Sequence, residues 1–163
     1  MMINQTDTKI EKEKSIRFEN LISLRKKMES NQVNREIIKI AEFLDSNGIN
    51  KNGPMITATF GEEIVDGKHI VDMEILVPID GKVSLPKPYV FKELFHLVHA
   101  VYARNVGDIE NLEKIYYDLQ KYIEDNSLQR ITAVYLVHVN DEYVMHGEIP
   151  IIDVYMGVNP SIL

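Results

Sequence analysis

The sequence predicts an α+β fold in which one strand-helix-strand-strand unit occurs twice. The first observation is an internal sequence repeat, because sliding the chain by 79 positions superposes its apolar residues. The matched pairs include Ile75 with Val154, Val77 with Met156, Phe43 with Tyr122 and Ile22 with Val101. The second observation is periodicity, since alternating apolar residues predict strands and a 3.6-residue spacing predicts a helix. We therefore expect curved antiparallel sheets and two main helices around a cleft on a pseudo-twofold axis.

Composition narrows the class of protein. The chain has 163 residues, no cysteine and a net charge of -7. This length suits one domain whose core is large enough to fold without disulfides. The lack of cysteine excludes a thiol nucleophile and a thiolate metal site. The acidic balance argues against nucleic-acid binding, and the lack of a long apolar run argues against a membrane span, so we expect a cytoplasmic protein.

The domain organisation follows from the internal repeat and from two segments, at the N-terminus and between the repeats, that lack its strand and helix pattern. Residues 1–14 are polar and predict a flexible tail, and one domain covers residues 15–163. Within the domain, the first repeat covers 15–80 and the second covers 91–160. The connector between them, residues 81–90, contains two prolines and is expected to be extended.

The first repeat has the clearer boundary signals. Its expected elements are a strand over 16–25, a helix over 33–44, and strands over 55–60 and 71–79. Asn20 breaks the alternation of the first strand and predicts a bulge or an exposed end. Ser30 is the expected helix N-cap, and Asn47-Gly48 is the expected helix end.

The second repeat follows the same order. Its expected elements are a strand over 94–104, a helix over 112–123, and strands over 131–139 and 148–158. Asp108 and Glu110 precede the helix, where the positive end of the helix dipole favours acids. Asn126-Ser127 takes the place that Asn47-Gly48 has in the first repeat.

Short motifs in this order resemble the GyrI-like superfamily, the effector-binding domains of bacterial transcription activators. The motifs are HAVY at 99–102, LQKYIEDNS at 119–127, AVYL at 133–136, DVYMGV at 153–158 and, in the first repeat, EILVPI at 74–79. Within the superfamily the chain is most similar to a small family of stand-alone domains from Gram-positive bacteria, often encoded near toxin loci of type VII secretion.

The resemblance implies a ligand-binding cleft between the two repeats. In members that sense drugs, a central glutamate balances the charge of a flat, apolar, cationic ligand. The position that aligns with this glutamate is Ala133, and its counterpart in the first repeat is Ala58. This departure argues against the sensing of cationic drugs and against a hydrolase that would use the same glutamate.

Six residues are the expected ligand contacts. Glu74 and Asp153 occupy equivalent positions on the strand face opposite the apolar core residues, so a pseudo-twofold could bring them together. The alternative is that both acids lie exposed on half-buried strands. The aromatic candidates for the cleft wall are Tyr135, Tyr155, Tyr102 and Phe95, with ordinary core packing as their alternative.

No catalytic or metal motif accompanies these residues. The sequence has no glycine-rich phosphate loop, no GxSxG elbow and no HExxH motif. We therefore expect no metal and no cofactor, and a non-enzymatic domain that binds a small apolar or aromatic ligand or a protein partner in the cleft. Two alternatives remain open: an adaptor or chaperone of a toxin or type VII secretion locus, and a small hydrolase that uses a cleft carboxylate.

Overall fold

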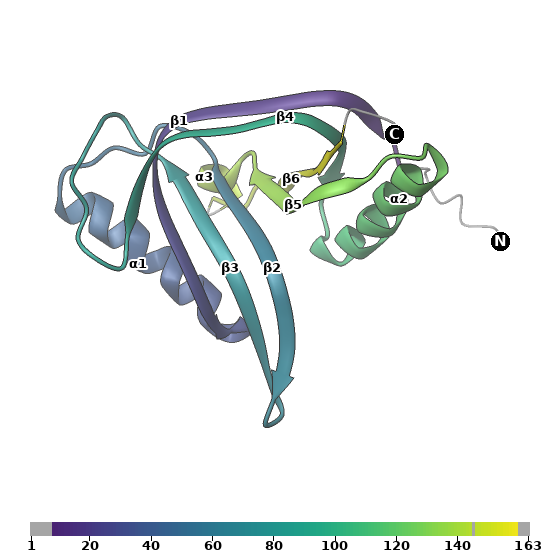
Figure 1. Ribbon diagram of the computed structural model, residues 1–163. Coiled ribbons are helices and arrows are strands. Elements are labelled where there is room, and N and C mark those ends of the chain that lie inside the picture. The colour runs from purple at the N-terminus through teal and green to yellow at the C-terminus, as the bar shows by residue number, and fades with distance from the viewer. Residues whose placement is uncertain (1–7, 145, 160–163) are drawn as a thin grey trace.

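The computed structural model of the protein describes residues 8–144 and 146–159. Its strands and two long helices are arranged as Figure 1 shows. The elements are β1 (Glu11–Glu29), a 3₁₀ turn (Ser30–Gln32), α1 (Val33–Ser46), β2 (Met55–Val65), β3 (Lys68–Pro78), β4 (Val90–Val106), a second 3₁₀ turn (Ile109–Asn111), α2 (Leu112–Asp125), β5 (Arg130–His138), α3 (Asp141–Val144) and β6 (Ile151–Val158).

The predicted duplication is confirmed at the level of single hydrogen bonds. Helices α1 and α2 both have 14 residues and begin 79 positions apart. At their ends, the side-chain amides of Asn47 and Asn126 donate to the carbonyls of Phe43 and Tyr122, each at 2.8 Å. The following residue, glycine in the first repeat and Ser127 in the second, has a left-handed φ of 64° or 56°. Both helices therefore end in the same cap.

The six strands form one antiparallel sheet that closes into a barrel in the order β1-β3-β2-β5-β6-β4. The two repeats meet at two seams, because β2 pairs with β5 and β1 pairs with β4. The first seam is short, covering 55–59 of β2 and 134–138 of β5. This arrangement confirms the predicted α+β class with two strand-helix-strand-strand units.

The strands present two faces with different neighbours. On the helix face, Ile40 of α1 packs over the first repeat and Leu119 of α2 packs over the second. On the inner face, a third apolar cluster fills the barrel, and Leu21, Leu76 and Tyr155 belong to it. Figure 1 shows the two helices on either side of the β2–β3 hairpin, below the long β1–β4 ribbon. In the described part of the chain, no helix is long and apolar enough to span a membrane.

Three local features refine the expected boundaries. Strand β1 begins at Glu11, so four residues of the predicted tail are strand, while residues 1–7 lie outside the described part. Asn20, where a bulge or an exposed end is expected, has a left-handed φ of 57°, but the register between β1 and β4 continues without a shift from Glu19 to Leu21. The predicted cap at Ser30 is wrong, because Ser30 opens the 3₁₀ turn and Gln32 Oε1 accepts the backbone N–H of Glu29 at 3.2 Å.

Candidate functional site

Four of the six predicted site residues form one row across the inner face. Strand register pairs Glu74 with Ala58, Ala58 with Tyr135, Tyr135 with Tyr155, and Tyr155 with Tyr102. Directly opposed residues of antiparallel strands share one face of the sheet. The row therefore crosses β3, β2, β5, β6 and β4, and it joins the two repeats through the β2–β5 seam.

The aromatic members of this row, together with Phe95 of β4, pack as two pairs. Phe95 meets Tyr135 edge to face with ring centroids 5.0 Å apart, and Tyr102 meets Tyr155 at the same centroid distance. Burial raises the pKa of Tyr135, and burial together with the nearby Asp153 raises the pKa of Tyr155 to about 12. Both phenols are therefore neutral at physiological pH, and their rings serve as packing surfaces.

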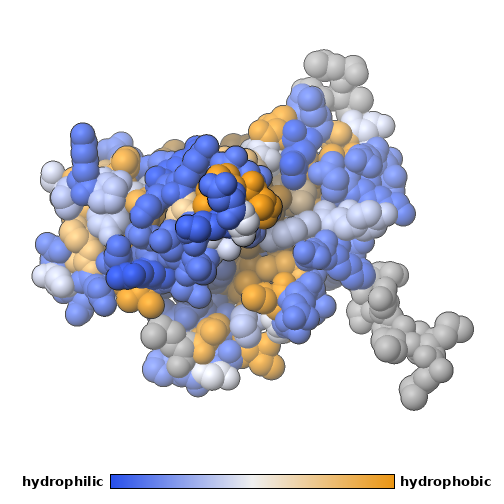
Figure 2. All heavy atoms as spheres, turned by 90° about the horizontal axis from the view of Figure 1, so that it is seen from below, coloured by the Kyte–Doolittle hydropathy of each residue, from blue (hydrophilic) through white to orange (hydrophobic). Residues whose placement is uncertain are grey.

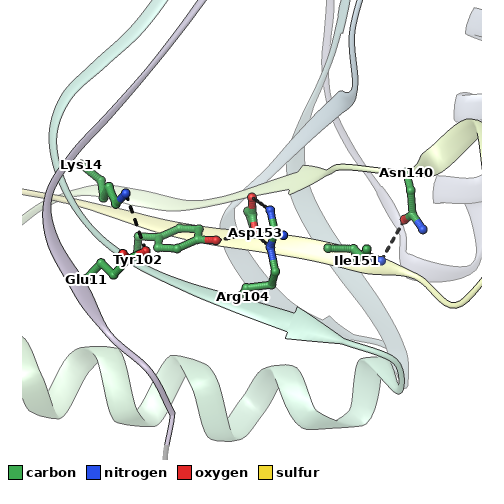
Figure 3. A network of polar contacts seen from close by, with 7 residues as sticks. All are labelled: Glu11, Lys14, Tyr102, Arg104, Asn140, Ile151 and Asp153. Carbon is green, nitrogen blue, oxygen red and sulfur yellow. Dashed lines mark hydrogen bonds and ion pairs between the residues drawn. The ribbon is translucent and has the colours of Figure 1, made fainter.

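Asp153 is the centre of a polar network at one end of this row (Figure 3). Its carboxylate accepts hydrogen bonds from Arg104 Nε at 2.7 Å and Nη2 at 3.0 Å, and from the Tyr102 hydroxyl at 3.0 Å. The hydrogen bond to Asp153 raises the pKa of Arg104 above its usual value. Lys14 adds a second cation, 5.6 Å above the Tyr102 ring. The carboxylate is thus neutralised by a bidentate arginine.

Glu74 has an equivalent network in the first repeat. Its carboxylate accepts a hydrogen bond from Ser23 Oγ at 2.6 Å, and Lys92 Nζ lies 2.5 Å away. Ser23 lies 79 positions before Tyr102, so the two hydroxyl donors occupy the same place in the two repeats. Lys92, however, comes from β4, so the cation for the first carboxylate is supplied by the second repeat.

The arginine of the first repeat has changed partner. Arg25 lies 79 positions before Arg104, yet it pairs with Asp72, with Nη2 and Oδ2 3.2 Å apart. Its guanidinium also lies 3.8 Å from the centroid of the Phe60 ring. Lys92 therefore occupies the role toward the first carboxylate that Arg104 has toward the second.

The two predicted carboxylates lie on the inner face but do not act as a pair. Glu74 and Asp153 are 5% and 7% exposed, so the alternative of two exposed acids is wrong. Among the described residues no hydrogen bond joins them, because each is held by its own hydroxyl and its own cation. A carboxylate held in this way is a weak candidate for a general base.

A cavity of about 450 Å³ lies on the helix face, where α1 meets the connection between β5 and β6. Its apolar wall comes from both repeats. This wall includes Ile37, Ile40, Leu44, Met55, Ile109 and Ile152. A cavity of this size and composition is typical of small-molecule sites, which measure roughly 300 to 1,000 Å³.

Polar groups of the cavity wall tie the two repeats together. The Asp141 carboxylate, just after β5, forms an ion pair with Lys51 at 2.8 Å and accepts the backbone N–H of Met55 at 3.0 Å. His138 Nε2 lies 2.9 Å from Thr57 Oγ across the β2–β5 seam. Burial lowers the pKa of His138, so this imidazole is neutral at physiological pH.

The cavity and the predicted site are different places. Among the described residues that line the cavity, none is one of the six predicted contacts. Strand parity explains the separation, because His138 lies three positions after Tyr135 and therefore on the opposite face of β5. His138 was visible in the sequence as a polar residue among apolar ones. The cavity beside His138 depends on the position of α1, so no local pattern in the sequence indicates it.

The comparisons identify the fold. No protein-family model and no curated protein sequence matches the chain. The C-terminal domain of EcmrR has a TM-score of 0.72 at 12% identity, with 94% of this chain and 99% of that domain covered. EcmrR bound to DNA in an open promoter complex has a TM-score of 0.73 at 13% identity. That match covers 95% of this chain and 58% of the EcmrR chain.

A hydrolase from Listeria innocua has a TM-score of 0.58 at 11% identity, with 91% of this chain and 93% of the hydrolase covered. At such identities the likeness shows the fold and not the activity. The chain has the GyrI-like effector-binding fold, as the sequence motifs indicate.

Proposed function

We propose that this GyrI-like domain binds a small apolar or aromatic molecule in the cavity between α1 and the β5–β6 connection. The observation that carries the proposal is the cavity itself, which measures about 450 Å³ and has an apolar wall built from both repeats. Small-molecule sites combine such walls with a few convergent polar groups. The neutral imidazole of His138 and the Lys51–Asp141 pair supply those groups here.

The six inner-face residues have a supporting role in this proposal. Their aromatic pairs and neutralised carboxylates hold the strands that carry the cavity wall in register. The prediction that these residues themselves contact a ligand stays a prediction, and it places the ligand on the opposite face of the sheet. The test below separates the two locations.

The experiment uses N-phenyl-1-naphthylamine, a neutral apolar dye whose fluorescence rises when it leaves water. We expect saturable binding by the protein and its loss in Ala41→Phe, because Ala41 lines the cavity and a phenyl group there would fill it. The matched control is Ile38→Phe on the same helix, since the Ile38 side chain is exposed and lies outside the cavity wall.

The outcomes are distinct. Equal binding by Ala41→Phe and the control would contradict the cavity proposal. Loss of binding in Tyr135→Ala, with Ala41→Phe unchanged, would place the ligand on the inner face instead. Thermal unfolding of each variant verifies that a loss of binding does not reflect a loss of folding.

A non-enzymatic role is supported by the state of the two carboxylates. A hydrolase that used Glu74 or Asp153 would need a carboxylate free to accept a proton from water or substrate. In the structure each carboxylate already has a cation within 2.7 Å. Turnover of an ester or amide that disappears in Asp153→Asn, while the variant stays folded, would overturn this part of the proposal.

A further inference from the structure

We propose that the free edge of β2, residues 60–65, binds an extended basic segment of a partner protein as an added strand. The proposal goes beyond ligand binding, because it concerns the β2–β3 hairpin and not the cavity. Figure 1 shows this hairpin reaching below the rest of the molecule. We use the name β2 edge for residues 60–65.

The register shows where the edge becomes free. Strand β2 pairs with β5 only from Met55 opposite His138 to Thr59 opposite Val134. On its other side, β2 stays paired with β3 as far as Val65 opposite Lys68. In the described part of the chain, the β2 edge therefore has a strand neighbour on one side only. Its outward backbone N–H and C=O groups form a template for another strand.

A β-bulge explains why β2 and β5 separate after Thr59. The register of β2 against β3 shifts between Thr59 and Gly61, at the position where the pairing with β5 ends. A bulge bends the strand that contains it and increases its twist. The hairpin is thereby turned away from β5, and the β2 edge extends free over six residues, roughly 20 Å of strand.

The β2 edge exposes apolar side chains. Ile64 is 70% exposed and Val65 is 44% exposed. Apolar side chains gather near the middle of the face toward which the hairpin extends (Figure 2). Edge strands are commonly protected by charged residues, proline or a bulge; the β2 edge has two glutamates and a bulge, but Ile64 and Val65 beyond them stay uncovered. An added strand would cover apolar surface that now faces water.

The acidic side chains of the β2 edge indicate which kind of strand it would bind. Glu62 and Glu63 are consecutive residues of the β2 edge, so their side chains point to opposite faces of the hairpin and each face carries one carboxylate, and the whole chain is acidic at -7. Two copies of this edge paired antiparallel would place these glutamates against one another, which is unfavourable. A segment with two consecutive lysine or arginine residues between aliphatic ones would instead place one cation on each face and cover the aliphatic side chains. The occupant is therefore a basic extended segment of another protein, and not a second copy.

The experiment uses a labelled seven-residue peptide with two consecutive lysines between valines, followed by fluorescence anisotropy with the 163-residue protein. Backbone amide exchange then locates the contact, and we expect new protection within residues 60–65. The control peptide has the same sequence with alternate amides N-methylated, which keeps the charge but prevents strand addition along one edge. We expect the N-methylated peptide to bind about tenfold more weakly or not at all.

A pair of variants separates the edge from general charge attraction. Glu62→Lys with Glu63→Lys is expected to weaken binding about tenfold. Glu42→Lys with Glu124→Lys makes the same change of charge on exposed helix positions and is expected to leave binding within about twofold. Equal losses in the two double variants, or equal binding of the N-methylated peptide, would overturn the proposal. So would a dimer of the protein alone that protects residues 60–65 from exchange.

Discussion

Replacing Arg104 with alanine is expected to leave the Asp153 carboxylate without its cation in a largely buried position. Asp153 is 7% exposed, and Arg104 contributes two of its three side-chain hydrogen bonds. A double-mutant cycle of Arg104→Ala and Asp153→Ala isolates the interaction between the two side chains. It cancels what each single change does to neighbours such as Tyr102.

The expected coupling follows from burial. Breaking a fully buried ion pair costs about 3 to 5 kcal/mol, because one charge stays behind without a partner. The Arg104 side chain is 48% exposed, so water screens part of the attraction. We therefore expect a coupling free energy of about 1 to 2 kcal/mol, between the values for buried and for surface pairs.

The first repeat offers an internal comparison for this measurement. Arg25 is the counterpart of Arg104, and its partner Asp72 lies at a more exposed position. We expect a clearly smaller coupling for Arg25 and Asp72 than for Arg104 and Asp153. Urea unfolding at neutral pH measures both cycles. Equal couplings, or a larger one for Arg25 and Asp72, would refute the argument that burial sets the strength of these pairs.

Two further changes test packing and protonation. Gly157→Ala should destabilise the fold by about 1 to 3 kcal/mol in urea unfolding, because the new Cβ would lie 2.5 Å from the Thr132 methyl carbon. Gly61→Ala is the control, since no described atom lies within 4 Å of its Cβ; an equal loss there would contradict this reason. For His138, burial lowers the folded-state pKa, so the unfolded chain binds the proton more readily. The contribution of His138 to folding stability is therefore complete above a pH of about 6.5 and is lost as pH falls toward the folded-state pKa. For this reason His138→Gln should reduce the fall in stability between about pH 7.5 and 5. A His138→Gln protein whose stability falls with pH as steeply as that of the wild type would contradict the assignment.

The inner face shows which features of the site could be predicted from the sequence. Strand alternation placed Glu74 and Asp153 opposite the helix-packed core, and the structure confirms that side. Strand alternation could not place Lys92 beside Glu74, because that contact joins β3 and β4, which are not neighbours in the sheet. Nor could it foresee that equivalent arginines take different partners, since Arg25 finds an aspartate at 72 where the second repeat has isoleucine.

The sequence by itself determined the duplicated unit, the α+β class and the core face of each strand and helix. These features are local, because side-chain period and turn chemistry act over a few residues and repeat at an offset of 79. Only the tertiary structure decided how the units join: the closure of the barrel, the five-residue β2–β5 seam and the cavity beneath α1. Those features depend on contacts between residues some 80 positions apart. They depend also on the space left between packed elements, and neither leaves a pattern along the chain.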